Sequence, residues 1–415
     1  MKMGRNLVLA AVAALTLPAL AHAAGYQIYE QGAAVLGMAG AGTASVKDAS
    51  AVFYNPANLV RMPGIKVYVG GSALGPTTDF KGDDPYPGSS VSESMTEQWF
   101  FPPHAYATWS NGRWGFGAGI NAPYGLGTEW EDPDTFTGRY VSTKSELEVL
   151  NGSAVVSYAV TPQLSIGAGY NYAMATVDLQ RRLFAPGFPP ATELGRVELE
   201  SDWTGNSGWN AAVTLQPEDV VRIAFTYRSE ITIKPEGDAT FTKTTALPIT
   251  LPPDQGVNTV LRLPAIWSLG WAIMPNERWT IEADANLTQW SAFEDLPLYF
   301  ETTPSQNSTV EENYRDAFQV RLGAEHRLPA FTYRFGYYYD QFAAPPESVS
   351  PILPDASRQG VTLGFGKDFG PLTLDAYYLG LFVQDRSTEG VSHYAYNGTY
   401  ETFINIFGVG IGLDF

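Results

Sequence analysis

The chain has 415 residues, no cysteine and a formal net charge of −18. The lack of cysteine excludes a disulfide framework and thiolate chemistry, and the acidity argues against nucleic acid as a partner. Glycine (41 residues), proline (29 residues) and aromatic residues are abundant, while only 16% of residues are charged. Length alone would allow two soluble domains, but no linker or change of composition follows residue 65, which favours a single domain.

Residues 1–23 have the pattern of a secretory signal peptide. Lys2 and Arg5 provide a positive start, Leu7 to Leu20 is an apolar core, and Ala21-His22-Ala23 is a small-x-small cleavage site. The apolar run is shorter than the ~18 residues that a spanning helix needs. We therefore expect the mature chain to begin near residue 24 and to be exported from the cytoplasm.

Residues 24–64 differ from everything that follows. They are rich in glycine and alanine, show only brief alternation, and end near the tripeptide Asn55-Pro56-Ala57. From residue 65 the chain becomes a long series of alternating apolar and polar positions, which is typical of strands. We predict an all-β fold in which residues 65–415 form a closed barrel and residues 24–64 form a plug, or hatch, inside it.

The alternation and the turn signals between its segments predict fourteen antiparallel strands. Their expected ranges are 65–74, 99–109, 113–122, 145–159, 163–180, 205–215, 219–233, 260–273, 278–291, 313–327, 331–341, 357–367, 371–385 and 401–415. The connections alternate between tight turns, such as Ser110-Asn111-Gly112, and long loops. The expected long loops are 75–98, 123–144, 181–204, 234–259, 292–312, 342–356 and 386–400.

Alternation alone leaves open whether the apolar face packs a soluble core or faces lipid. An even number of strands, with tight turns on one side and long loops on the other, is the pattern of outer-membrane barrels. The last strand ends on Phe415, which we expect at the periplasmic end, where the barrel insertion machinery would recognise it. Tryptophans near strand ends fit interfacial girdles; these are Trp99, Trp109, Trp114, Trp130, Trp279 and Trp290.

Several short stretches together resemble the long-chain fatty acid transporter family of Gram-negative outer membranes, which includes relatives that take up aromatic hydrocarbons. The stretches are Ala24-Gly25-Tyr26-Gln27, Asn55-Pro56-Ala57, Tyr124-Gly125-Leu126 with Thr128-Glu129, Ser145-Glu146-Leu147-Glu148, Thr226-Tyr227-Arg228-Ser229-Glu230, Leu263-Pro264-Ala265-Ile266-Trp267 and Trp290-Ser291-Ala292-Phe293. The resemblance implies a fourteen-stranded transmembrane barrel with an N-terminal hatch in its lumen. It also implies a monomer and a third strand that is kinked, with a lateral gap towards the bilayer.

The stretch that matches the kink is Asn121-Ala122-Pro123-Tyr124-Gly125. Pro123 lacks a backbone donor and Gly125 weakens a strand, so the residues themselves predict a break in pairing there. Pro123 could equally well end the strand as the outer loop begins. The resemblance favours a lateral opening at Pro123, Tyr124 and Gly125.

The outer loops contain apolar patches, including 183–190 with Phe184 and Phe188, and parts of 234–259 and 342–356. Such surface can mark a binding site, or the loops can pack on one another over the barrel mouth. In the family a basic residue follows the fifth strand, and Arg181 or Arg182 matches it, although either could be a solvated loop charge. The family's second basic residue has no match, because Pro297 stands near its place.

We expect outer-membrane transport of hydrophobic molecules down their gradient, with long-chain fatty acids first and monoaromatic hydrocarbons or alkanes as the alternative. The cargo would touch Arg181, Arg182, Phe184 and Phe188 in the loops, and Tyr26, Ile28 and Tyr29 in the hatch, before lateral release. Further expected contacts are outer-membrane lipids and lipopolysaccharide.

Two rival functions are less favoured. An enzyme would need a base for its nucleophile, and His104, His326 and His393 have no convincing partner by spacing. A general diffusion porin would need a polar and open lumen. We expect no cofactor and no metal site; the acidic cluster at 129–134 could hold Ca²⁺ or be a solvated loop.

Overall fold

The computed structural model describes residues 25–185 and 192–415. The predicted signal peptide 1–23 and the predicted contact residue Phe188 lie outside the described residues. No helix in the described part of the chain is long and apolar enough to cross a membrane.

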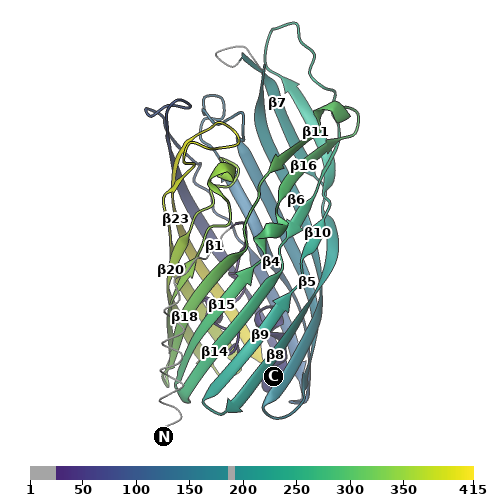
Figure 1. The fold of residues 1–415 in the computed structure, drawn as a ribbon. Coiled ribbons are helices and arrows are strands. Elements are labelled where there is room, and N and C mark those ends of the chain that lie inside the picture. Colours follow the sequence, from purple (N-terminus) through teal and green to yellow (C-terminus); the bar gives the residue numbers. More distant parts are fainter. Residues whose placement is uncertain (1–24, 186–191) are drawn as a thin grey trace.

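Within the described residues, a closed antiparallel barrel of 14 strands confirms the predicted fold class (Figure 1). Its strands are β1 (Gly64–Gly82), β3 (Pro103–Ser110), β4 (Trp114–Glu129), β5 (Lys144–Ala159), β6 (Leu164–Ala185), β8 (Thr204–Glu218), β9 (Val221–Arg228), β14 (Ile266–Asn276), β15 (Trp279–Thr288), β18 (Ala317–Arg327), β19 (Thr332–Asp340), β20 (Arg358–Phe369), β21 (Leu372–Val383) and β23 (Gly398–Asp414). The first and last strands close it, in register from Lys66 opposite Asp414 to Gly82 opposite Gly398.

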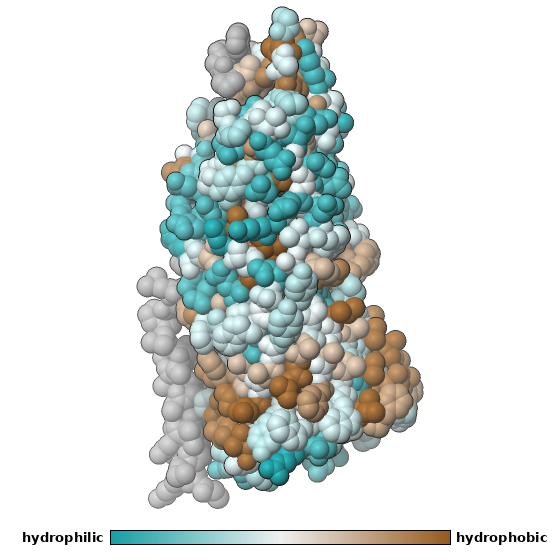
Figure 2. Space-filling view, turned by 90° about the vertical axis from the view of Figure 1, so that its right-hand side faces the viewer, coloured by the Kyte–Doolittle hydropathy of each residue, from teal (hydrophilic) through white to brown (hydrophobic). Residues whose placement is uncertain are grey.

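The two faces of each strand show that the wall is inverted relative to a soluble barrel. On β15, Glu282 and Asp284 are only 1% and 2% exposed, whereas Ile281, which precedes Glu282, is 48% exposed. Ionisable side chains therefore face the lumen and apolar ones face outward, as in a barrel surrounded by lipid. Figure 2 shows apolar surface concentrated over the lower part of the molecule, and a mostly hydrophilic surface above it.

The upper part is more ordered than the predicted loops. Strand β1 continues to Gly82, and β6 continues to Ala185. The connections predicted as long loops contain further strands, namely β2 (Ser92–Ser94), β7 (Thr192–Ser201), β11 (Glu236–Lys243), β12 (Gln255–Thr259), β16 (Asp295–Phe300), β17 (Ser308–Glu311) and β22 (Arg386–Ser387). The prediction of loops at 181–204, 234–259 and 292–312 was thus wrong over these strands. The predicted strands 219–233 and 260–273 are each divided, so that β10 (Ile231–Ile233) and β13 (Leu261–Leu263) form a separate two-stranded sheet.

Four of the additional outer strands are stabilised by a small hydrophobic core of their own. Strands β7, β11, β12 and β16 pair in sequence as an extension of the wall above β6. Their apolar side chains pack together, with Val197, Leu199 and Phe300 among the buried ones. In Figure 1 this sheet rises above the rest of the barrel mouth. In a connection with many alternating apolar residues, strand pairing lets the side chains pack in cross-strand pairs. This packing stabilises the connection more than an irregular path over the surface would.

Residues 25–63, here called the inner segment, lie within the barrel. They contain two short helices, α2 (Ala33–Leu36) and α3 (Ala51–Tyr54), and the 3₁₀ helix η1 (Pro56–Arg61), and almost all of their side chains are buried. Carboxylates of the wall hold this segment. Asp284 accepts from the backbone N–H groups of Gly42 and Thr43 at 3.0 and 2.9 Å, and Glu282 accepts from those of Ala44 and Ser45.

Further contacts fix the same segment to the neighbouring strands β18 and β19. Lys47 forms an ion pair with Glu325, which is also paired with Arg334 at 2.8 Å. A β-carbon at Gly323 or Gly336 would lie 2.5–2.6 Å from the backbone of Met38. The wall therefore carries glycine where the inner segment passes closest, and charge where the segment offers backbone donors.

Removing the two carboxylates should loosen the inner segment. In the double variant Glu282→Ala, Asp284→Ala, four buried N–H groups lose their acceptors, at a cost of about 1–3 kcal/mol each. We expect amide hydrogen exchange at residues 42–45 to become at least about tenfold faster, while exchange in the strands stays slow. Hydrogen–deuterium exchange read by mass spectrometry on the purified barrel measures both.

The matched control is Glu218→Ala, which removes an exposed carboxylate at the end of β8. Unchanged exchange at residues 42–45 in a folded double variant would contradict this account of how the segment is held.

Candidate functional site

The tripeptide Asn55-Pro56-Ala57 joins two parts of the inner segment to each other and to the wall. The Asn55 side-chain amide donates to the carbonyl of Thr43 at 2.7 Å and to the hydroxyl of Thr214 on β8 at 2.8 Å. Its side-chain carbonyl accepts from the N–H of Ala57 and so caps η1. One side chain thus connects the turn near residue 43, the start of η1 and the barrel.

The pairing between β3 and β4 stops halfway up the barrel. Strand β4 follows β3 only from Gly115 to Asn121, and its register with β5 shifts between Asn121 and Tyr124. This shift lies in the stretch for which the sequence predicts a kink. Above it the inner segment takes the place of β3. Ile28 donates its N–H to the carbonyl of Pro123, and Gly125 donates to that of Tyr26, both at 2.9 Å.

Behind this gap lies a cavity of about 350 Å³, here called the lateral cavity. Its lining is mostly apolar and comes from the start of the inner segment, the chain before β3, strands β4 and β5, and residues 353–356. Phe101 and Leu150 line it and are also 71% and 39% exposed on the outer surface. The lateral cavity thus borders the outward-facing side of the wall at the place where the ladder is open.

A second cavity, of about 70 Å³, lies on the other side of Tyr26 and is here called the inner cavity. It is lined by Tyr26, Leu126, Glu146, Leu147, Val177, Leu179, Thr259, Leu261, Phe293, Leu296, Glu312, Tyr314, Ser348, Ser350, Ile352 and Leu353. The two cavities share Tyr26, Leu126, Glu146, Leu147 and Leu353. These five residues are the partition between them.

Aromatic neighbours hold Tyr26 in this partition. Its ring packs edge-on against Trp290 with centroids 4.7 Å apart, and against Phe293 at 5.6 Å. Its hydroxyl donates to the carbonyl of Arg262 at 2.9 Å. The prediction that Trp290 and Trp130 belong to an interfacial girdle was wrong, because both are almost completely buried. Trp99, Trp109 and Trp114 are exposed, as such a girdle requires.

The residue before Tyr26 is fixed as well. Gly25 has φ +70°, and a β-carbon there would lie 2.5 Å from the ring of Trp290. Its N–H donates to Asp355 at 2.8 Å, while the second oxygen of Asp355 accepts from Ala343 and Ala344. Burial raises the pKa of Asp355, and the amides that donate to it act in the opposite direction.

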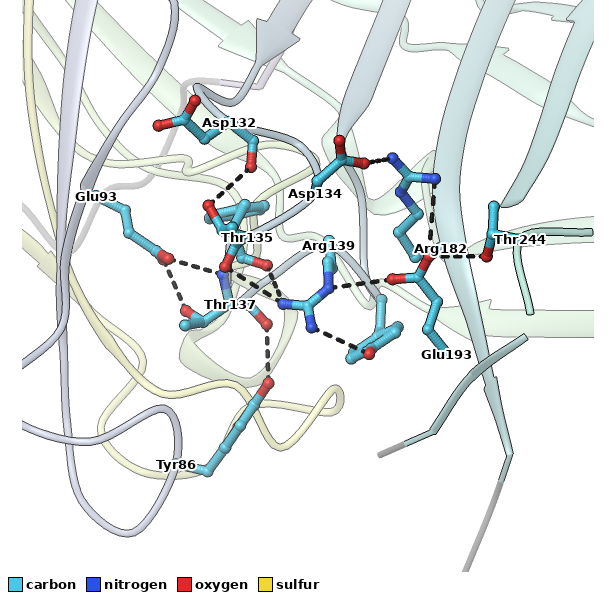
Figure 3. Close-up of polar contacts among 12 residues, drawn as sticks. Tyr86, Glu93, Asp132, Asp134, Thr135, Thr137, Arg139, Arg182, Glu193 and Thr244 are labelled. Atoms are coloured by element: carbon cyan, nitrogen blue, oxygen red, sulfur yellow. Dashed lines mark hydrogen bonds and ion pairs between the residues drawn. The ribbon is translucent and has the colours of Figure 1, made fainter. Parts of the chain in front are cut away.

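The two predicted arginines have different surroundings. Arg182 forms an ion pair with Asp134 and lies 3.8 Å from Glu193, which is also 3.5 Å from Arg139 (Figure 3). These charges connect the loop between β4 and β5 with strands β6 and β7. Arg181, the preceding residue, has no ion pair among the described residues, and burial lowers its pKa, which interaction with Tyr394 partly offsets. Neither arginine lines either cavity.

Of the other predicted contact residues that the structure describes, two line at least one of the two cavities and two line neither. Tyr26 lines both cavities and Ile28 lines the lateral one. Tyr29 lies deeper in the inner segment, under the guanidinium of Arg321, 4.0 Å from its ring centroid. Phe184 is half exposed and packs against Tyr140 outside the cavities.

The sequence did not single out Asp355 or Glu312, which come from two different outer loops. No spacing rule connects residues near 26 with residues near 300 and 350. Two signals pointed to this region. The apolar loop 342–356 contains Leu353, and the stretch Trp290-Ser291-Ala292-Phe293, which carried the resemblance, supplies two of the rings around Tyr26.

Comparison with known proteins agrees with this geometry. Residues 14–415 match the family model described as outer membrane protein transport protein (OMPP1/FadL/TodX). A long-chain fatty acid transport protein of Escherichia coli O6:H1 is 26% identical over 93% of this chain and 94% of its own length. The crystal structure of a Pseudomonas aeruginosa FadL homologue superimposes with a TM-score of 0.83 at 22% identity, covering 94% of this chain and 100% of its own.

The toluene transporter TodX of P. putida has the same fold, with a TM-score of 0.78 at 20% identity over 93% of this chain and 99% of its own. The match to the family model covers almost the entire chain, and the barrel, its outward apolar face and the strand count agree with it. The chain therefore belongs to the outer membrane protein transport protein family (OMPP1/FadL/TodX) and is an outer-membrane barrel of the kind that transports hydrophobic compounds.

Proposed function

We propose that the protein takes hydrophobic molecules from the outer face of the membrane into its two cavities and releases them sideways into the bilayer. The observation that carries this proposal is the interrupted ladder between β3 and β4, with the apolar lateral cavity directly behind it. In the bilayer, an open strand edge is costly unless another group satisfies it. Here the start of the inner segment satisfies it, with Ile28 and Tyr26.

In this proposal the inner segment acts as the hatch. Tyr26 stands between the inner and lateral cavities, so its withdrawal would join them into one passage. The same movement would break the two hydrogen bonds to Pro123 and Gly125 and so leave the ladder open. Opening the passage and opening the wall are therefore one event.

The lateral cavity has the size of a small-molecule site, for which about 300–1,000 Å³ is typical. Burial stabilises a fatty chain by about 0.8 kcal/mol per methylene, so about fourteen methylenes contribute on the order of 11 kcal/mol before ordering costs. Binding then needs few polar contacts. Transport driven by the gradient alone suits such cargo, since the molecule leaves one apolar environment for another.

Long-chain fatty acids are the first candidate cargo, and the relative from E. coli carries that name. Monoaromatic hydrocarbons are the second candidate, and one observation favours them. The only arginine on the lining of the lateral cavity within the described residues is Arg358, which is already paired with Asp340 at 2.8 Å. We propose that the barrel works as a monomer, with its exposed apolar wall in contact with outer-membrane lipid.

A reversible cross-link tests whether the hatch must move. Gln27 and Tyr124 face each other in an antiparallel bridge, and the flanking hydrogen bonds make them a non-hydrogen-bonded pair, whose Cα atoms lie about 4.5 Å apart. That distance suits a disulfide, and the chain has no cysteine of its own. We expect Gln27→Cys, Tyr124→Cys to abolish uptake of a fluorescent fatty acid when oxidised and to recover it on reduction.

Cells carrying Gln27→Cys alone, treated with the same oxidant, control for effects of the reagent. Full uptake through a barrel whose disulfide has formed quantitatively would rule out movement of the hatch start as a required step.

Bulky side chains in the gap test the lateral route. Ala122 and Gly125 line the lateral cavity beside the open ladder. With Trp at both positions, uptake should be lost because the exit is filled. Gly152→Trp is the matched control, since a side chain there meets no atom within 4 Å. Uptake that persists in the doubly substituted barrel would show that cargo leaves by another path.

Competition identifies the cargo class. A fluorescent long-chain fatty acid bound to the purified barrel should be displaced by oleate and not by a short sugar. Displacement by toluene alone would assign the protein to aromatic hydrocarbon uptake. Failure of the fluorescent probe to bind, together with a steady conductance in planar bilayers, would instead indicate a diffusion porin.

A further inference from the structure

One acidic side chain on the inner cavity has no partner. Glu312 follows β17 in the outer loop before β18 and is only 5% exposed. Its backbone is well held, since its N–H donates to the carbonyl of Glu294 at 2.8 Å and its carbonyl accepts from the hydroxyl of Ser348 at 2.6 Å. Its carboxyl group has no hydrogen bond and no ion pair with any residue that the structure describes. The side chain instead borders the inner cavity.

The groups around Glu312 do not compensate its charge. Glu146 is the other acidic residue on the lining, and it is paired with Lys144 at 2.8 Å. No lysine, arginine or histidine is among the residues that line the inner cavity in the described chain. The remaining titratable groups within electrostatic range are three phenols, from the inner segment, from the loop before β18 and from the loop before β23; they are Tyr26, Tyr314 and Tyr394.

Burial without a counter-charge raises the pKa of Glu312 to about 8. Because the pKa is raised, the carboxyl is neutral below that value, so at neutral pH it is a carboxylic acid. Such a group offers one O–H donor and free acceptor oxygens. A buried polar group without a partner costs free energy, so this side chain does not stabilise the empty barrel. Its chemistry is suited to a group that enters the cavity.

We propose that the inner cavity binds the uncharged hydroxyl-bearing head group of an amphiphile, as in an alcohol, a phenol or a protonated carboxylic acid, through the carboxyl of Glu312. The apolar chain would then lie towards Tyr26 and the lateral cavity. This assignment rests on the proposed transport function and specifies which cargo the inner cavity accepts. An anionic head group would find no cation among the described residues of this lining. An uncharged hydroxyl would instead give the carboxyl of Glu312 the hydrogen-bond partner that it lacks.

Binding of four small probes to the barrel in lipid nanodiscs tests the assignment. The probes are 1-dodecanol, toluene, dodecanesulfonate below its micellar concentration, and a sugar. For the wild-type protein we expect 1-dodecanol and toluene to bind, and dodecanesulfonate, which is always anionic, to be rejected. The Glu312→Leu variant should lose about fivefold in affinity for 1-dodecanol, the equivalent of one hydrogen bond, and keep its affinity for toluene.

Two further variants separate this role from a structural one. Glu312→Gln keeps the shape and both hydrogen-bonding functions, so it should keep the affinity for 1-dodecanol. Glu312→Lys should gain binding of dodecanesulfonate, because it places a cation on the lining. The matched control is Glu311→Leu, the same change at the adjacent, exposed position, and it should leave all affinities unchanged.

Equal binding of 1-dodecanol by wild type and Glu312→Leu, with toluene also bound, would overturn the role of Glu312 while leaving the transport function intact. Equal binding of 1-dodecanol and dodecanesulfonate by the wild type would overturn the selection for uncharged head groups. If neither toluene nor 1-dodecanol binds to any variant, the cavities are not hydrophobic sites, and the proposed function fails together with the assignment.

Discussion

Backbone hydrogen bonding in lipid is the constraint on which this structure depends. A strand in the hydrocarbon region has no water to satisfy its N–H and C=O groups, so every strand must be paired on both sides. The ladder between β1 and β23 meets this demand along its full length. The upper half of β4 does not, and there the chain that precedes the barrel supplies the missing partner through Tyr26 and Ile28.

Different parts of the inner segment are bound to the barrel wall by different kinds of contact. Most of it is bound strongly, because buried carboxylates at Glu282 and Asp284 accept from consecutive backbone amides, and Asn55 joins it to β8. Its first residues are bound differently. They depend on two ladder hydrogen bonds, the hydroxyl of Tyr26 and the contact of Gly25 with Asp355. A local release of the start is therefore compatible with an inner segment that stays in place.

The cavities lie on either side of Tyr26 in these first residues. Their walls are mostly apolar, and of the two acidic side chains that line the inner cavity, Glu146 is paired with Lys144 and Glu312 has no ion pair among the described residues. The arginines above them act differently, since Arg182 binds loops together through Asp134 and Glu193. Arg182, which the resemblance suggests as a partner for a cargo carboxylate, thus forms ion pairs that hold the barrel mouth together.

Much of the barrel followed from the sequence, because strand alternation and turn length are local. Residues such as Ile281 and Glu282 alternate whether or not a partner strand is known, and the asymmetry of the connections indicated a membrane. Pro123 and Gly125 also carry a local signal, since one lacks a donor and the other lacks a side chain. The outer sheet of β7, β11 and β12 escaped prediction because its pairing partners are distant in the chain.

The site itself could not be foreseen in the same way. Tyr26 was identified from the resemblance, but its role as a partition depends on Trp290, Phe293 and Leu353, which reach it from separate loops. Local pattern cannot show which polar residue remains unpaired, and Glu312 is indistinguishable from Glu311 in the printed chain. The sequence by itself determined a lipid-facing barrel with an unusual N-terminal segment, because period and composition are properties of each segment alone. Only the tertiary structure decided where the ladder is open and which carboxyl faces the cavity, because both depend on contacts between residues hundreds of positions apart.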